Sequence, residues 1–302
     1  MIKRQWIYLK EMYPLPSRLA VGFILFFELY FIVILNSGIE RYRVGWHEIL
    51  GALTVFAFLL LLRIADDFKD YETDQRLFPE RALPSGRVKK KDLAVLLVVA
   101  EAPAIALNLL FMNNRPFFLF LYIYGFLMCM WFFQKSKIQT NLVLACVTHN
   151  PVQMIINIYV ISFACIKYGI SAQSLFVIMA AFTMYFPGLI WEVSRKIRAP
   201  RDETEYVTYS KIYGYRKATQ FVLVLTCLDI VTNYILVWRL NTVSVFLLTA
   251  NLVWMLADFV RYMKDPTRFA IVDKVIRYTF IQEGLMIGTI VWYLLFGRVY
   301  LF

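Results

Sequence analysis

The sequence predicts an all-α protein, a polytopic membrane helical bundle of about nine transmembrane helices around a central cavity. Hydrophobic residues make up 60% of the chain and its mean hydropathy is +0.60, values typical of multi-span membrane proteins. Nine apolar stretches are long enough, or nearly so, to cross the hydrocarbon core of a bilayer. The loops on one side of the membrane also contain many more lysines and arginines than those on the other side, as is usual in multi-span proteins.

Each predicted span is an apolar run bounded by polar residues. We expect transmembrane helices at residues 19–36, 48–64, 93–112, 116–133, 142–166, 174–191, 219–238, 243–262 and 279–296. Residues 1–16 mix charged side chains with aromatic ones and are expected to lie at the membrane interface. No low-complexity linker interrupts the series, so we expect one membrane domain over residues 1–302.

The formal net charge of +11 is explained mainly by membrane orientation. With the N-terminus inside and nine spans, 26 of the 32 lysines and arginines fall in inside segments and the other six fall outside. This asymmetry places two long polar loops on the cytoplasmic side, the first cap at about 65–92 and the second cap at about 192–218. The same distribution argues against nucleic acid as a partner.

The first cap opens with a run of carboxylates. Asp66, Asp67, Asp70 and Asp74 follow the second predicted span directly. A helix would bring Asp67, Asp70 and Asp74 close together on one face, with Asp66 beside them. Like charges at this spacing repel one another, which indicates a bound cation, and all-oxygen ligands suit Mg²⁺ or Mn²⁺. The alternative is a solvated acidic cap that is balanced by nearby bases.

This pattern of acids suits the departure of diphosphate. A carbon–oxygen bond to diphosphate breaks readily when a metal ion held by carboxylates neutralises the developing negative charge. Arg76 and Arg81 follow the acids and are candidates to bind phosphate oxygens, because an arginine can contact two of them at once.

The second cap groups bases around one acid. Helical spacing puts Glu192 beside Arg195 and Lys196, which favours a diphosphate cradle, with Glu192 as a further metal ligand. The alternative is a charge cap that only orients the span. Further candidates for diphosphate binding or for the substrate pocket are Lys137, Tyr209, Lys211, His149, Asn150, Asp202 and Glu203.

These features resemble the UbiA superfamily of intramembrane prenyltransferases. The family's first motif, Asn-Asp-x-x-Asp-x-x-x-Asp, is similar to Asp66-Asp67-x-x-Asp70-x-x-x-Asp74, and the downstream segment Arg81-Ala82-Leu83-Pro84-Ser85-Gly86 also fits. The resemblance implies a helical bundle whose cavity opens sideways to lipid. It also implies Mg²⁺-assisted ionisation of an isoprenyl diphosphate and transfer of the prenyl chain to a small-molecule acceptor.

The sequence departs from the family pattern in two places. The second motif, usually Asp-x-x-x-Asp-x-x-x-Asp, reads Glu192, Lys196 and Pro200, and the loop motif Tyr-x-x-x-Lys reads Phe133-x-x-x-Lys137. The superfamily also contains membrane terpene cyclases, and residues 66–70 spell the Asp-Asp-x-x-Asp signature of soluble cyclases. A terpene cyclase that releases diphosphate is therefore the alternative to a prenyltransferase. A membrane transporter is a third alternative, disfavoured because these acids lie at the inside end of a span.

Overall fold

The computed structural model describes residues 1–299. Every secondary-structure element assigned to these residues is a helix. Eight helical segments are long and apolar enough to cross a membrane, and α6 (Arg115–Cys129) is a shorter apolar helix. The predicted class is therefore confirmed: the protein is an all-α, multi-pass integral membrane protein.

The helices belong to two structural units. Unit 1 comprises Met1–Phe27 and Arg41–Lys135, and unit 2 comprises Glu28–Glu40 and Ser136–Phe302. Helix α2 (Leu15–Asn36) contributes its first half to unit 1 and its second half to unit 2. The expectation of one domain over the whole chain stays a prediction.

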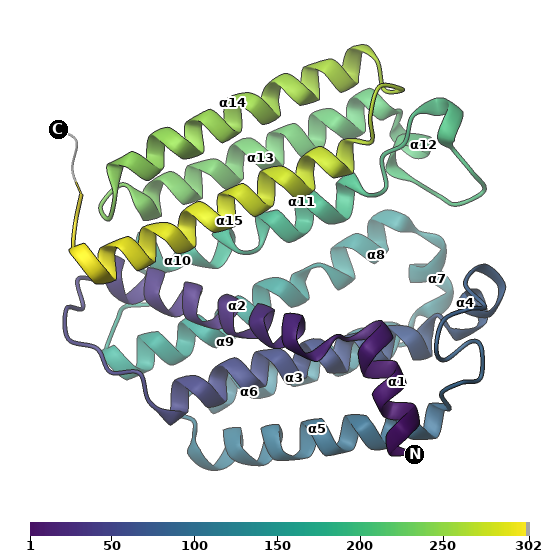
Figure 1. The fold of residues 1–302 in the computed structure, drawn as a ribbon, viewed down its shortest axis with the longest axis horizontal. Coiled ribbons are helices and arrows are strands. Elements are labelled where there is room, and N and C mark those ends of the chain that lie inside the picture. The colour runs from purple at the N-terminus through teal and green to yellow at the C-terminus, as the bar shows by residue number, and fades with distance from the viewer. Residues whose placement is uncertain (300–302) are drawn as a thin grey trace. The chain divides into compact units, whose positions relative to one another are not determined.

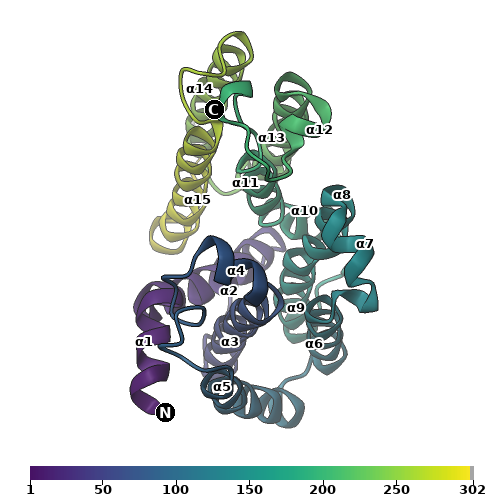
Figure 2. The ribbon, with the colours of Figure 1, turned by 90° about the vertical axis from the view of Figure 1, so that its right-hand side faces the viewer.

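Unit 1 contains the N-terminal helix, three spans and the first cap. In addition to α2, its helices are α1 (Ile2–Met12), α3 (Trp46–Lys69), α4 (Tyr71–Leu77), α5 (Lys90–Phe111), α6 (Arg115–Cys129) and the 3₁₀ turn η1 (Trp131–Phe133). Helix α3 packs against α5 and α6, and α1 lies against α5 (Figure 2). A Cβ atom on Gly51 would lie 2.2 Å from the Phe26 ring, so only glycine permits this approach of α2 to α3.

Unit 2 contains the second cap and the remaining spans. Its further helices are α7 (Lys135–Thr140), α8 (Leu142–His149), α9 (Pro151–Tyr168), α10 (Leu175–Thr183), α11 (Phe186–Ser194), η2 (Pro200–Asp202), α12 (Tyr209–Tyr213), α13 (Tyr215–Val237), α14 (Thr242–Lys264) and α15 (Ile271–Phe296). Helices α13, α14 and α15 run side by side (Figure 1). Val222, Phe259 and Val275, one from each of these helices, are fully buried in the core between them.

The predicted spans overlap the observed helices, but three are interrupted. Two of them, at 142–166 and 174–191, break just before Pro151 and Pro187, because proline lacks the amide that would continue the hydrogen-bond ladder. The span predicted at 116–133 ends at Cys129. There the backbone turns left-handed through Trp131–Phe133, with φ angles of +53°, +49° and +57°, a conformation that costs L-residues about 1–2 kcal/mol each.

Candidate functional site

The acidic run of the first cap crosses a kink between two helices. Helix α3 ends at Lys69 and α4 begins at Tyr71, with Asp70 between them in a non-helical conformation (φ −97°, ψ 8°). The amide of Asp70 still donates to the carbonyl of Asp66 at 2.9 Å, and the amide of Asp74 to the carbonyl of Asp70 at 2.8 Å. The expectation that the run lies on one helix is therefore wrong, because the helix is kinked at Asp70. The helical hydrogen-bond spacing nevertheless continues through the kink.

Three of the four carboxylates are paired with a base of unit 1. The pairs are Asp67–Arg63 at 2.7 Å, Asp66–Lys69 at 3.1 Å and Asp74–Arg81 at 2.8 Å. Asp67 and Asp74 are both buried. These partners explain how acids are tolerated at the end of a span, since a buried charge left without a partner is strongly destabilising.

Asp70 is the exception among the four acids. Its carboxylate makes no hydrogen bond or ion pair with the described residues 1–299. Burial raises the pKa of Asp70, and the charges of Asp66, Asp74 and Asp67 raise it further, whereas Lys69 lowers it. The four carboxylates therefore act on one another at this kink, and Asp70 is the one without a counter-ion.

The N-terminal helix α1 is tied to the acidic run. The hydroxyl of Tyr8 donates a hydrogen bond of 2.5 Å to Oδ2 of Asp67, and both side chains are buried. Burial raises the pKa of Tyr8, so its hydroxyl stays protonated and remains a donor. One turn earlier, Arg4 donates two hydrogen bonds, of 2.6 and 2.9 Å, to the Asp92 carboxylate near the start of α5. Helix α1 thus fixes the orientation of Asp67.

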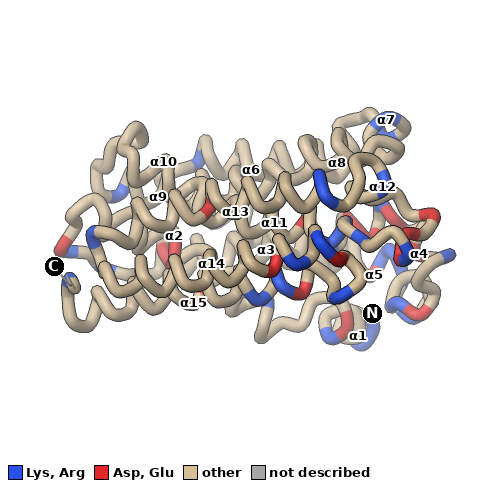
Figure 3. The backbone as a smooth tube through the Cα atoms, turned by 90° about the horizontal axis from the view of Figure 1, so that it is seen from above, with Lys and Arg blue, Asp and Glu red and all other residues tan. Residues whose placement is uncertain are grey.

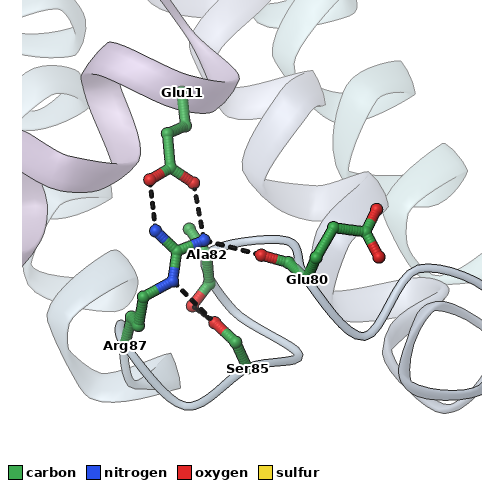
Figure 4. A network of polar contacts seen from close by, with 5 residues as sticks. All are labelled: Glu11, Glu80, Ala82, Ser85 and Arg87. Atoms are coloured by element: carbon green, nitrogen blue, oxygen red, sulfur yellow. Dashed lines mark hydrogen bonds and ion pairs between the residues drawn. The ribbon is translucent and has the colours of Figure 1, made fainter.

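Arg87 ties the loop after α4 to α1 (Figure 4). Its guanidinium pairs with both carboxylate oxygens of Glu11 and donates to the Glu80 carbonyl at 2.6 Å. Its Nε donates to Oγ of Ser85 at 3.0 Å, and that hydroxyl donates to the Ala82 carbonyl at 3.2 Å. This network fixes the conformation of the loop that follows the acidic run.

Along the backbone of unit 1, positions of charged residues gather at α1, α4 and the start of α5 (Figure 3). Arg76, a predicted phosphate ligand, is exposed on α4. Among residues 1–299, no three His, Cys, Asp or Glu side chains converge closely enough to hold a metal ion. The salt bridges account for this, because three of the acids already contact a base. To bind Asp66, Asp67 or Asp74, a divalent cation would have to compete with the base that each of these acids contacts.

The second cap has the predicted pairing of one acid with two bases. Glu192, near the end of α11, pairs with Arg195 at 2.6 Å and with Lys196 at 2.8 Å. Arg195 also lies over the ring of Trp191, 5.0 Å from its centroid. One carboxylate and two bases leave the cluster with a net positive charge, which suits an anion better than a metal ion.

The segment after η2 folds back around Glu203. The carboxylate of Glu203 accepts hydrogen bonds from the hydroxyls of Thr208, at 2.7 and 2.9 Å, and of Ser210, at 2.5 Å. Nζ of Lys211 donates to the Thr204 carbonyl at 3.0 Å. Glu203 and Lys211 therefore each hold the local structure of the second cap.

The remaining candidates of unit 2 occupy different environments. The Tyr209 hydroxyl is buried, with no hydrogen-bond partner among the described residues, whereas Lys137 and Asp202 are exposed. His149 and Asn150 lie at the break between α8 and α9. Asn150 donates to Sγ of Cys146 at 3.0 Å, a local hydrogen bond at the break that precedes Pro151.

Fold and charge pattern together define a class, a polytopic helical membrane protein with an acidic cap after its second span. The chain shares its fold with a solved digeranylgeranylglyceryl phosphate synthase in membranes. The TM-score is 0.63 at 15% identity, and the match covers 96% of this chain and 98% of the other. The expected resemblance is thus confirmed for the fold. No family model and no curated protein matches the sequence.

Sequence reasoning did not find the partners of the acids. Arg63 lies four residues before Asp67, so helical spacing would have identified this pair. Tyr8 lies 59 positions from Asp67, and no local pattern connects them. Its role in orienting the acidic run follows only from the packing of α1.

Proposed function

We propose that the protein is a Mg²⁺-dependent intramembrane enzyme that ionises an isoprenyl diphosphate and transfers the prenyl chain to a small-molecule acceptor. One observation carries the proposal: four mutually interacting carboxylates, one of them without a counter-ion, lie at the end of a span. The fold shared with an intramembrane prenyltransferase supports it. The apolar prenyl chain would lie in the lipid bilayer, with its diphosphate at the caps on the cytoplasmic side.

Mg²⁺, or Mn²⁺, suits the donor chemistry of the first cap, because both prefer carboxylate oxygens. We assign Asp70 and Asp66 as its first ligands, since Asp70 has no partner and Asp66 contacts only Lys69. Asp67 and Asp74 complete the acidic set, and Glu192 is a further candidate ligand. When bound, the ion neutralises charge on the diphosphate as the carbon–oxygen bond breaks.

Bases of the first cap and bases of the second cap are each proposed to bind diphosphate oxygens. An arginine fork contacts two oxygens at once, whereas a lysine acts as a point charge. Such donors increase the rate when they contact charge that grows in the transition state. The proposed diphosphate-binding residues are Arg76, Arg81, Lys137, Arg195, Lys196, Tyr209 and Lys211.

A terpene cyclase is the second candidate function. The Asp-Asp-x-x-Asp run at residues 66–70 and the basic second cap favour it. In a cyclase, the prenyl cation is captured by a double bond of its own chain, so no acceptor is needed.

One experiment separates these functions. Purified protein is incubated with Mg²⁺ and geranyl, farnesyl or geranylgeranyl diphosphate, without an acceptor. We expect little hydrocarbon product, and diphosphate release that increases when a membrane extract supplies acceptors. A cyclic hydrocarbon would identify a cyclase. Absence of metal-dependent diphosphate release under all conditions, with metal uptake into vesicles, would overturn both enzymatic proposals in favour of a transporter.

A further inference from the structure

A second polar cluster lies within the membrane-spanning part of unit 2. Asp229 of α13, Glu283 of α15 and Glu28 of α2 each lie near the middle of an apolar helix. Asp229 is fully buried and Glu28 is 4% exposed, whereas Glu283 is partly buried. Ionisable residues at this depth are rare and usually functional. Each of the three is the single acid within a predicted span, at 19–36, 219–238 and 279–296, a signal that the sequence-based expectations did not include.

Neutral donors surround Asp229. Its Oδ1 accepts hydrogen bonds from the amides of Gln282, at 3.1 Å, and Asn233, at 3.2 Å, and its Oδ2 lies 3.5 Å from the hydroxyl of Tyr278. The charge of Glu283 also acts on Asp229. Asp229 therefore belongs to the same electrostatic cluster as Glu283, and its own oxygens already have donors.

Glu28 and Glu283 form a carboxyl pair without a base. The two carboxyls lie within hydrogen-bonding reach of each other, and the charge of Glu283 acts on Glu28. No Lys, Arg or His of residues 1–299 pairs with Glu28, Glu283 or Asp229. The titratable groups that face the pair are Asp229 and, beyond it, Tyr278. By contrast, buried Asp67 and Asp258 each contact an arginine. Asp67 and Asp258 thus each have a counter-charge, whereas the Glu28–Glu283 pair has none among the described residues.

The unpartnered atoms of the cluster are all acceptors. Those buried without a hydrogen-bond partner are Glu28 Oε1, Glu28 Oε2, Glu283 Oε2, Gln282 Oε1 and Asn233 Oδ1. Each is an oxygen, and a buried oxygen acceptor without a donor is costly unless a proton or a cation is supplied. The pair supplies two carboxylates, against four in the first cap, so a divalent ion is disfavoured here. A monovalent cation needs fewer charged ligands.

We propose that Glu28 and Glu283, together with the amide oxygens of Gln282 and Asn233, form an intramembrane site for a monovalent cation. The cation is either a proton shared by the two carboxyls or a sodium ion. Binding removes one of the two negative charges of the pair and so favours the folded state of unit 2. The site is independent of the proposed prenyl transfer, because it uses none of the residues assigned to that reaction.

Thermal unfolding of the full-length protein in detergent tests the proposal, with sodium chloride or choline chloride as the only salt and at several pH values. For a sodium site, the unfolding midpoint rises with sodium but not with choline. For a shared proton, it rises as the pH falls, without dependence on sodium, and an infrared band of a protonated carboxyl is present. Glu28→Gln and Glu283→Gln are expected to abolish the response, because the amide mimics a protonated carboxyl.

Glu101→Gln is the matched control. Glu101 is also a buried carboxyl within a span, but it accepts a 2.7 Å hydrogen bond from Tyr122 and lies in unit 1. This variant should keep the sodium response of the parent. Because Oε1 of Glu101 is also buried without a partner, any pH response that this variant loses is assigned to Glu101 and not to the pair. The proposal is overturned if the parent responds to neither cation, or if the response persists unchanged in both single variants. Glu283→Gln suffices where Glu28→Gln does not fold, because Glu283 is the more exposed of the two.

Discussion

The hydroxyl of Tyr8 donates a 2.5 Å hydrogen bond to the carboxylate of Asp67. Asp67 also contacts Arg63 at 2.7 Å, so one oxygen faces a neutral donor and the other a cation. The buried acid is thereby held in one orientation at the start of the acidic run. Helix α1, which lies outside the predicted spans, thus contacts the acidic run directly.

Replacing Tyr8 with phenylalanine should therefore destabilise the protein. The ring is kept, but a buried carboxylate oxygen loses its donor, a loss of about 1–3 kcal/mol in the free energy of unfolding. We expect diphosphate release to slow as well, because Asp67 loses its fixed orientation. Denaturant unfolding in detergent measures the first effect. Tyr71→Phe is the control, since the Tyr71 hydroxyl only accepts an exposed bond from Gln75; equal effects of the two variants would contradict the prediction.

Asp70→Ala should abolish diphosphate release without unfolding the protein. Asp70 has no partner among residues 1–299, and removing its charge relieves repulsion from three neighbouring acids. Stability without metal should therefore be equal to that of the parent or higher. Added Mg²⁺ should raise the unfolding midpoint of the parent but not of the variant. Full turnover in the variant would remove Asp70 from the proposed metal site.

The second cap allows a comparison of three bases. Arg195→Ala and Lys196→Ala should each lower the maximal rate on the order of 10²-fold, the effect of one lost transition-state donor. Arg195→Lys should restore activity only in part, because a point charge does not reproduce the arginine fork. Arg198→Ala is the control, since Arg198 donates to Thr204 and does not contact Glu192. Diphosphate release at saturating substrate distinguishes these outcomes from a cap that only orients the span, which predicts parent-like rates throughout.

Membrane orientation is tested by labelling with a reagent that cannot cross the bilayer. In a cysteine-free background, cysteines at Ser85 and Thr204, both exposed, should react from the same side. A cysteine at Ser171, in the loop between α9 and α10, should react from the opposite side. The reason is the unequal distribution of lysine and arginine between inside and outside loops. Labelling of positions 85 and 204 from opposite sides would contradict the cytoplasmic placement of both caps.

The sequence predicted what depends on local spacing. Apolar runs located the spans, because hydropathy over about twenty residues is a local property. The pairing of Glu192 with Arg195 and Lys196 followed from helical spacing and is confirmed. The contact of Tyr8 with Asp67 depends on how α1 packs, which no local pattern contains. The end of α6 at Cys129 was also not predicted, because Trp131–Phe133 contains no glycine to signal a left-handed turn.

That turn provides the last prediction. Phe133 has φ +57° and is 69% exposed, so its side chain contributes little to packing, while its backbone is strained. Phe133→Gly should relieve this strain and be more stable than Phe133→Ala by about 1 kcal/mol, because only glycine adopts positive φ without steric cost. Both variants lose the same ring, so their difference in unfolding free energy reports the backbone alone. Phe133→Val should be the least stable of the three, because a β-branched residue tolerates this conformation worst. If glycine gives no advantage over alanine at this position, the backbone does not hold a left-handed turn here.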